Sequence, residues 1–507
     1  MPNARTLIEL LTQNQAQSAA IRAPGRKSLT FDGLKIQVTQ TMCLLEEAGI
    51  MPEDRVAIVL PNGPEMASAF LSVASYAVAA PLNPAYQQEE FAFYLSDIKA
   101  KAIITSEEAS SPILEVAKKN GIPLIYLKSL ANEPAGIFTL SIPRTIRDVS
   151  PRIPPPENTA LILHTSGTTS KPKIVPLSHI NLCASAHNIS NWLNLKQSDV
   201  CLNIMPLFHI HGLIAAVLSS LYVGGSVACT PGFNALQFFS WLNEIKPTWY
   251  TAVPTMHQAI LSRADRNKDI VNRNNLNFIR SSSSSLPVPV MEELERTFCA
   301  PVIESYGMTE ATHQMTSNPL PPQERRPGCV GVAAGPEVKI MDTNGKLLGP
   351  DKIGEVVIRG DNVTRGYENN DSANIISFND GWFRTGDQGK MDSSGYLTLT
   401  GRLKEIINRG GEKISPREVD DVLITHPSIS QVVVFSVPHK KLGEDVAAAI
   451  VLRKNQNITA GEIREFLSKK LAAFKIPNTI VFLDEIPTGS TGKLQRIGLA
   501  EKLGLIE

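Results

Sequence analysis

The most informative stretch of this chain runs from His164 to Lys173 and reads His-Thr-Ser-Gly-Thr-Thr-Ser-Lys-Pro-Lys. A short apolar run, residues 160–163, leads into it and predicts a buried strand. Gly167 allows close backbone approach to a ligand, and the surrounding hydroxyl and ammonium groups are donors for a polyphosphate. No G-x-x-x-x-G-K-[ST] pattern fits the stretch, so it is not a P-loop. Taken alone, it is more commonly an ordinary polar surface loop.

Length and composition describe an ordinary globular protein. The 507 residues exceed what one compact core accommodates, so at least two domains are expected. Basic and acidic residues number 49 each, which argues against a nucleic-acid or acidic-membrane partner. The six cysteines form no C-x-x-C pair, which favours reduced thiols over a disulfide framework or a zinc site. No apolar run reaches the ~18 residues of a membrane span.

The two ends of the sequence favour a cytoplasmic location. The first residues open an amphipathic segment with Leu7, Leu10 and Leu11, unlike a secretory signal. The last residues carry no peroxisomal tripeptide. We therefore expect a cytoplasmic protein.

Apolar runs that alternate with helical periods predict an α/β fold with parallel sheets. The predicted strands are residues 56–60, 102–105, 123–126, 202–206, 249–254, 278–280 and 302–306. The predicted helices are residues 65–78, 113–120 and 213–221. Three strands end in polar turns, near residues 208–212, 281–285 and 306–310, and open α/β sheets bind ligands at such strand ends. We expect these turns to line one cleft.

The pattern of predicted helices and strands changes twice towards the C-terminus. From about residue 338, short strands with Gly and Asn/Asp turns predict an antiparallel or barrel-like subdomain. Beyond Arg402 an α+β pattern returns, with helices 416–426 and 460–471 and strands 431–437 and 446–452. We place a boundary between Leu403 and Lys404, so that residues 1–403 form a large N-terminal domain and residues 404–507 a small C-terminal domain.

Five motifs occur in order along the chain. They are residues 165–173, 306–310 (Tyr-Gly-Met-Thr-Glu), 381–387 (Gly-Trp-Phe-Arg-Thr-Gly-Asp), 401–405 (Gly-Arg-Leu-Lys-Glu) and 492–493 (Gly-Lys). With this series the chain resembles the AMP-forming acyl-CoA synthetases of the adenylate-forming superfamily, which includes firefly luciferase and the adenylation domains of peptide synthetases. The resemblance implies ATP, Mg²⁺ and coenzyme A. It also implies a reaction in which an acid first forms an acyl-AMP and then an acyl-CoA.

The first step sets a carboxylate against the α-phosphate of ATP, so cations and oriented donors must offset the repulsion. By resemblance, the β- and γ-phosphates are held by Thr165, Ser166, Gly167, Thr168, Thr169 and Lys173. Thr309 reaches the phosphates, and Glu310 holds Mg²⁺, a cation that prefers oxygen ligands. Without the motif, Glu310 could equally be a solvated carboxylate at a helix start.

The resemblance also assigns the nucleoside site. Tyr306 stacks on the adenine. The backbone of the serine turn, including Ser283 and Ser284, lines the other face of the base. Asp387 accepts hydrogen bonds from the ribose hydroxyls, and Arg402 assists. Taken singly, Tyr306 could be a core tyrosine and Asp387 a turn residue.

The C-terminal residues imply a moving part. By resemblance, Lys493 contacts the α-phosphate and the substrate carboxylate during adenylation. A lysine at that place obstructs the thiol in the second step, and the family resolves this by rotating the C-terminal domain about a hinge, here Lys404. The loop of residues 408–413 then lines the pantetheine tunnel, with Gly411 allowing close backbone approach.

The candidate acid pocket is polar. It consists of His209, His211, Ser282, Ser283 and His313, and we count His211 among the catalytic candidates with Lys493, Thr309 and Glu310. A buried second carboxylate has to be met by donors, which these side chains offer. The residues alone leave open that the serines are merely small and the histidines merely packed.

Several segments are similar to the oxalyl-CoA synthetases of plants and fungi, which implies oxalate as the acid, with His211, His313 and a serine at its distal carboxylate. These segments are residues 206–212, 249–255, 280–281, 309–313 and 408–416. Ser282, Ser284 and the approach to Lys493 through residues 488–490 are departures that leave another small or polar acid open.

Two alternatives to a CoA ligase use the same motifs. One is a stand-alone adenylating enzyme that loads a carrier protein. The other is a non-catalytic nucleotide-binding protein, against which the intact Lys493, Glu310, Asp387 and Lys173 argue. A ligase for another short or aromatic acid also stays open. The sequence makes no prediction of the oligomeric state.

Overall fold

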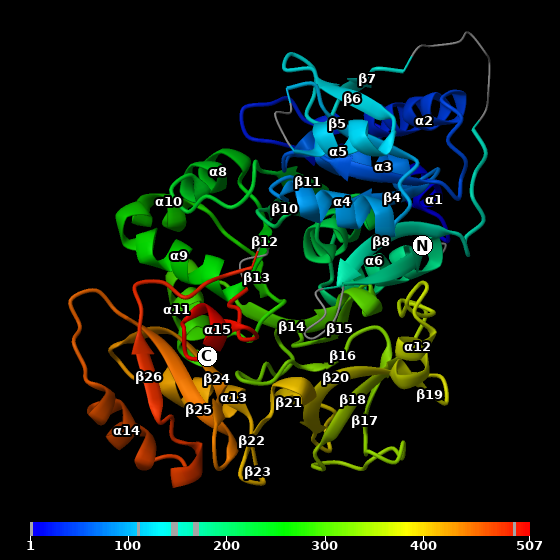
Figure 1. Cartoon of the computed structure of the whole chain (residues 1–507). Helices are drawn as coiled ribbons and strands as arrows, with labels where there is room; N and C mark the ends of the chain where they lie inside the picture. Colours follow the sequence, from blue (N-terminus) through cyan, green and yellow to red (C-terminus); the bar gives the residue numbers. More distant parts are fainter. Residues whose placement is uncertain (1–3, 109–111, 143–150, 166–171, 490–492, 507) are drawn as a thin grey trace.

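The computed structural model describes residues 4–108, 112–142, 151–165, 172–489 and 493–506 (Figure 1). Within these residues the strands form four sheets, of seven, nine, five and five strands. In the first two sheets buried strands alternate with helices, which is the α/β arrangement expected from the sequence. The predicted fold class is confirmed. None of the described helices combines the length and the apolar character needed to cross a bilayer.

The seven-stranded sheet has the order β7-β6-β5-β3-β4-β8-β9. Its interior strands pair in parallel, and the edge strands β7 and β9 are antiparallel to their neighbours. The strands are β3 (Arg55–Val59), β4 (Val78–Pro81), β5 (Ala102–Ser106), β6 (Leu124–Ser129), β7 (Phe138–Leu140), β8 (Thr159–Thr165) and β9 (Lys173–Ser178). The helices of this region are α2 (Phe31–Glu47), α3 (Pro64–Ala74), α4 (Gln88–Asp97) and α5 (Ile113–Asn120).

Helix α3 differs from the helix predicted over residues 65–78. It ends at Ala74, and residues 78–81 form strand β4 instead. Both elements are almost entirely buried and rich in small residues, so their apolar pattern has no period that separates helix from strand. Pairing of β4 with β3 on one side and β8 on the other decides its conformation.

The nine-stranded sheet positions the predicted cleft. Its order is β16-β15-β14-β13-β12-β10-β11-β1-β2. The strands are β1 (Ala19–Arg22), β2 (Leu29–Thr30), β10 (Val200–Asn203), β11 (Ser226–Cys229), β12 (Trp249–Ala252), β13 (Phe278–Ser281), β14 (Val302–Met308), β15 (His313–Ser317) and β16 (Val332–Ala333). The helices packed around it are α1 (Leu7–Thr12), α6 (His179–Trp192), α7 (Ser219–Tyr222), α8 (Phe238–Ile245), α9 (Pro254–Ala264), α10 (Lys268–Arg273) and α11 (Val288–Phe298). Strands β10 to β13 are buried along their whole length, as expected for parallel strands covered on both faces.

The helix predicted at residues 213–221 begins earlier than expected. His211–Leu218 forms a π-helix, which α7 continues. Such wider turns occur often at functional sites. A Cβ on Gly212 would lie 2.4 Å from the carbonyl oxygen of Pro206, so only glycine fits where this helix leaves its strand.

Two smaller sheets complete the chain. One is antiparallel and open, with β17 (Glu337–Met341), β18 (Gly354–Arg359), β19 (Phe378–Asn379), β20 (Trp382–Met391) and β21 (Leu397–Arg402), beside α12 (Asp371–Ser377). The other contains β22 (Ile407–Arg409), β23 (Glu412–Ile414), β24 (Ile429–His439), β25 (Gly443–Leu452) and β26 (Thr479–Phe482), with α13 (Pro416–Leu423), α14 (Ala460–Ser468) and α15 (Leu499–Lys502).

A single 3₁₀ turn, Leu403–Glu405, joins these two sheets, and the predicted domain boundary falls within it. The last sheet has its own hydrophobic core. Gln258 on α9 reaches across to it and donates to the carbonyl oxygen of Ser430 at 3.2 Å. Figure 1 shows the red C-terminal segment reaching back towards the ends of β12 and β13. The boundary itself stays a prediction.

Candidate active site

The three polar turns meet at one edge of the nine-stranded sheet. Strands β10, β12, β13 and β14 are neighbours and run parallel. Their carboxyl ends therefore share an edge, and the polar turns that follow β10, β13 and β14 lie beside one another there. The cleft expected from the sequence would lie at this edge.

Tyr306, Asp387 and Arg402 converge, as predicted for the nucleoside site. The hydroxyl of Tyr306 donates to Oδ2 of Asp387 at 2.5 Å, and Nε of Arg402 donates to Oδ1 at 3.0 Å. Asp387 and Arg402 are direct partners across β20 and β21, which explains how their side chains meet. The carboxylate is buried, whereas about half of the Arg402 side chain, 49%, is exposed. The arrangement presents a fixed acceptor at the edge of the cleft.

Glu310 is a buried carboxylate in the turn after β14. It is 5% exposed, and its Oε1 accepts a hydrogen bond from the hydroxyl of Tyr367 at 2.7 Å. Burial raises the pKa of Glu310, while the bond from Tyr367 and the charges of Arg402 and Lys173 oppose that rise. Lys173 lies with Nζ 4.2 Å from the centre of the Tyr367 ring. Mg²⁺ in nucleotide enzymes takes one or two carboxylates together with phosphate oxygens, and this single carboxylate beside a cation fits that requirement.

Tyr367 was not predicted from the sequence. It lies 57 residues after Glu310, outside every motif, and only the fold brings the two together. The neighbouring Thr309 begins the same 3₁₀ turn that contains Glu310.

Lys493 reaches both halves of the cleft. Burial, together with the charge of Arg402, lowers its pKa to about 8, and Asp387 and Glu310 oppose that shift. Its charge also contributes to the lowered pKa values of His209, His211 and His313. The ammonium group therefore lies within electrostatic range of the nucleoside site and of the predicted acid pocket together.

Arg496 anchors the segment that carries this lysine. Its Nη2 donates to Oδ2 of Asp420 at 2.7 Å, and its Nε lies 3.0 Å from Oε2 of Glu405. It also donates to the carbonyl oxygen of Val434. The arginine thus ties the lysine segment to α13, to β24 and to the turn next to Lys404.

His211 and His313 form the centre of the predicted acid pocket. Their ring centres lie 4.8 Å apart. Nδ1 of His211 is 3.0 Å from the hydroxyl of Ser283, and Nε2 is 2.6 Å from the hydroxyl of Thr251. Burial, as the main cause, lowers the pKa of both histidines well below the ordinary value and that of His209 to about 3. All three are neutral at neutral pH.

Two residues of this pocket have left-handed backbones. Ser283 has φ of 74° and His313 has φ of 98°. Such conformations cost about 1–3 kcal/mol each outside glycine and concentrate at functional sites. Gly307 makes the second one possible, because a Cβ there would lie 1.5 Å from the carbonyl oxygen of His313. The backbone is therefore built to present these two side chains.

Arg280, at the end of β13, is a second residue that the sequence analysis missed. It is fully buried, and among the described residues no carboxylate forms an ion pair with it. Nη1 lies 3.4 Å from Nε2 of His211, and Nη2 lies 3.4 Å from Nδ1 of His313. Burial lowers the pKa of Arg280 to about 9. The sequence feature that could have indicated a site residue is an arginine directly after the apolar residues of a strand.

Some predicted residues do not join the cleft. The hydroxyl of Ser282 donates to the carbonyl oxygen of Ser305 at 2.9 Å, so this side chain braces the turn. Gly411 lies in the exposed turn between β22 and β23 with φ of 101°, and no atom lies within 4 Å of a Cβ placed there. Lys404 lies in the turn between the small sheets, and its charge acts on Lys173. Ser284 is half-buried in the serine turn.

The phosphate loop is only partly described. Thr165 is the last residue of β8 and Lys173 is the first residue of β9, and the two residues are paired across these antiparallel strands. Ser166, Gly167, Thr168 and Thr169 lie outside the described residues.

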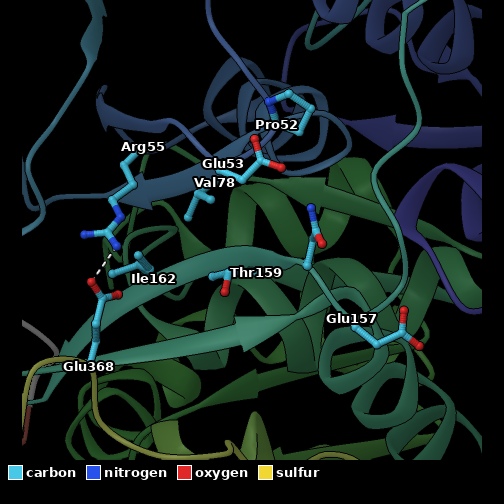
Figure 2. A pocket seen from close by; sticks show the side chains of 9 residues that line it. Pro52, Glu53, Arg55, Val78, Glu157, Thr159, Ile162 and Glu368 are labelled. Atoms are coloured by element: carbon cyan, nitrogen blue, oxygen red, sulfur yellow. Dashed lines mark hydrogen bonds and ion pairs between the residues drawn. The ribbon is translucent and has the colours of Figure 1, made fainter.

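A separate hollow of about 320 Å³ lies elsewhere, beside β3, β4 and β8 (Figure 2). None of the predicted site residues lines it. Its arginine, Arg55, is paired with Glu368 at 2.5 Å, and the other charged groups in its wall are Glu53 and Glu157. This wall offers no uncommitted cation to a phosphate or a carboxylate ligand, so the cleft at the strand ends remains the candidate site.

Comparison with known proteins agrees with this geometry. The AMP-binding enzyme family matches residues 10–368, and the AMP-binding enzyme C-terminal domain matches residues 418–493. The chain is 43% identical to an oxalate–CoA ligase of Arabidopsis thaliana over 97% of this chain and 96% of the relative. It is 44% identical to an oxalate–CoA ligase of Saccharomyces cerevisiae over 89% and 87%. The crystal structure of ATP-bound MatB from Rhodopseudomonas palustris superposes with a TM-score of 0.89, at 27% identity and 98% coverage of both chains.

Proposed function

The chain belongs to the AMP-binding enzyme family, and we propose that it joins oxalate, or another small polar acid, to coenzyme A through an acyl-AMP intermediate. The observation that carries the choice of acid is the pocket around His211 and His313. It is buried, rich in hydrogen-bond donors and backed by an arginine that has no carboxylate partner in the part of the chain that the structure describes. The names of the two relatives at 43% and 44% identity support the same acid.

In the first step a carboxylate oxygen of the acid attacks the α-phosphorus of ATP. A new O–P bond forms, the bond to the β-phosphate oxygen breaks, and pyrophosphate leaves. Lys493 is positioned to offset the charge that builds up between the two anions. Asp387, Tyr306 and Arg402 hold the nucleoside, so that the α-phosphate faces the acid pocket. Glu310 would hold Mg²⁺, which when bound neutralises phosphate charge.

In the second step the thiol of coenzyme A attacks the acyl carbon, loses its proton, and AMP leaves. In the role proposed for the first step, Lys493 would obstruct the approach of the thiol to this carbon. A rotation at Lys404 would withdraw it and bring the β22–β23 turn, with Gly411, towards the cleft. The exposure of Gly411 and the electrostatic influence of Asp387 and Glu310 on Lys493 support this proposal.

The chemistry of the pocket favours a short acid with a second anionic group. A long apolar chain would leave Nε2 of His313, which is buried and has no partner among the described residues, without an acceptor, and this costs about 1–3 kcal/mol. It would also offer no acceptor to the hydroxyl proton of Ser283. A second carboxylate next to the reacting one would instead accept hydrogen bonds from them. Oxalate is the smallest acid with this property.

The test is ATP–pyrophosphate exchange with oxalate, malonate, acetate, octanoate and coumarate, followed by mass detection of the CoA thioesters. We expect oxalate to give the highest kcat/KM and an oxalyl thioester. A higher value for acetate, octanoate or coumarate would contradict the proposal. Transfer to a holo carrier protein, with none to coenzyme A, would instead favour an enzyme that loads carriers. Lys493→Ala serves as the control for exchange by contaminating enzymes.

A further inference from the structure

Arg280 contacts the acid pocket from behind. Arg280 lies in β13, one residue before the strand ends. Its two Nη atoms point towards different histidines, His211 and His313. Nη2 also donates to Oε1 of Gln314 at 3.1 Å, and Nη1 to the hydroxyl of Thr251 at 3.5 Å. The guanidinium group therefore touches both imidazoles at once and is held there by two uncharged acceptors.

The chemistry of arginine fixes the direction of these contacts. A guanidinium group has five N–H donors and no acceptor, so any ring nitrogen that it contacts has to be an acceptor. Nε2 of His211 and Nδ1 of His313 are those nitrogens. A neutral imidazole carries its single proton on the other nitrogen. The proton therefore resides on Nδ1 in His211 and on Nε2 in His313, which are opposite tautomers.

These tautomers leave two donors without an acceptor. The Nδ1 proton of His211 goes to the oxygen of Ser283, 3.0 Å away, which leaves the proton of the serine hydroxyl for another acceptor. Nε2 of His313 is buried and has no hydrogen-bond partner among the described residues. The two donors belong to Ser283 and His313, the same two residues that are held at positive φ. Strained backbone and unused donors thus coincide.

We propose that Arg280 is a positioning residue that sets the opposite tautomers of His211 and His313 and so aims the Ser283 hydroxyl and His313 Nε2–H at the second carboxylate of a short dicarboxylic acid. The identity of that acid rests on the proposed function, whereas the tautomers rest on the contacts of Arg280. The Thr251 hydroxyl, 2.6 Å from Nε2 of His211, can donate to that nitrogen while it accepts from Arg280, which agrees with this tautomer. The guanidinium charge, which has no carboxylate partner among the described residues, is then balanced by the bound carboxylate.

The consequence is selection against monocarboxylic acids. A site built to hydrogen-bond a group that the substrate lacks rejects that substrate by about 10⁴–10⁵-fold, because its buried polar groups stay unpaired. Removing Arg280 would free both imidazoles to take either tautomer. One or both donors would then become acceptors, which repel a carboxylate.

The direct test is ¹⁵N NMR of the full-length protein with labelled histidine, with His211→Asn and His313→Asn used to assign the signals. The ring-nitrogen shifts distinguish the two tautomers. We expect His211 protonated on Nδ1 and His313 on Nε2 in the unmodified protein. The same tautomer at both residues, or the reverse pair, would overturn the proposal without recourse to any Arg280 variant.

Exchange assays with Arg280→Met and Arg280→Lys test the functional part. For the dicarboxylic acid that the unmodified enzyme prefers, we expect kcat/KM to fall by about 10² or more, mainly through KM, while acetate changes by less than about threefold. Lysine keeps the charge but lacks the fork that contacts two imidazoles, so it should not rescue the loss. Arg22→Met, which removes an arginine bonded to Ser226 in the same sheet, is the matched control and should leave both acids unchanged.

The outcomes separate this inference from the choice of acid. If the unmodified enzyme prefers malonate to oxalate, the proposed acid is wrong, and the Arg280 variants are scored on malonate. If the unmodified enzyme prefers a monocarboxylic acid, or if Arg280→Met lowers activity with acetate and with the dicarboxylic acid equally, the inference is overturned. Thermal unfolding of each variant checks that it is folded at the assay temperature.

Discussion

The pKa of Lys493 makes the first half-reaction dependent on pH in a defined direction. Burial and the charge of Arg402 lower this pKa to about 8. In its proposed role the lysine assists the reaction only as a cation. The protonated fraction therefore falls as pH rises through 8. With that pKa, about nine-tenths of the lysine is charged at pH 7 and about one-tenth at pH 9, so kcat/KM for adenylation should fall about tenfold over this range. Above pH 9 it should fall about tenfold for each further pH unit.

The assay is ATP–pyrophosphate exchange with the preferred acid, measured from pH 6 to pH 10. The decrease of kcat/KM at high pH (its basic limb) reports the pKa of the lysine in the free enzyme, whereas the basic limb of kcat reports its pKa in the complex with ATP. The phosphate charges of bound ATP stabilise the ammonium form, so the limb in kcat should lie at higher pH than the limb in kcat/KM. This displacement is the sign of a cation that acts on the phosphates.

Lys493→Arg is the decisive control. Arginine stays charged through this range, so the variant should have a lower rate but no basic limb near pH 8. A limb near pH 8 that persists in the variant would refute the assignment to Lys493, as would a flat profile for the unmodified enzyme up to pH 10.

Three further perturbations have defined outcomes. Lys493→Ala should lower the exchange rate by about 10²–10³, the usual cost of one transition-state donor, and near-normal exchange would rule out its role. Lys404→Pro, which fixes φ, should spare acyl-AMP formation in a single-turnover assay and strongly slow thioester formation; equal loss in both steps would argue against a hinge. Gly307→Ala should lower the free energy of unfolding by about 3 kcal/mol or more, because the new Cβ overlaps the carbonyl oxygen of His313, and an unchanged melting curve would contradict this.

The sequence predicted the parts of the site that lie in contiguous motifs. Tyr306, Asp387 and Arg402 were named from three motifs, and the fold joins the last two because residues 387 and 402 are partners across adjacent strands. Tyr367 could not be predicted in this way, since its contact with Glu310 depends on the packing of the small antiparallel sheet against the strand ends. Contacts between sheets leave no local pattern in the sequence.

Arg280 illustrates a different limit. The residue type and its place after an apolar run were visible, but a charged residue at a strand end is usually solvated. Only burial and the two divergent contacts to His211 and His313 distinguish it from an ordinary surface arginine. The protonation of each ring follows from these contacts and has no counterpart in the sequence. For β4 the difficulty is local: its small apolar residues fit both a helix and a strand, so the sequence pattern does not distinguish the two.

The contacts of Arg496 bear on how the enzyme would pass from one step to the next. Its partners Glu405, Asp420 and Val434 all follow Lys404 in the chain. A rotation at Lys404 would carry this arginine, its three partners and Lys493 together as one rigid unit, and the contacts within that unit would stay intact. The cost of withdrawal would then fall on contacts across the cleft, chiefly the attraction between the Lys493 ammonium and the anions bound there. Departure of pyrophosphate weakens that attraction, so the progress of the chemistry would itself time the release of this unit.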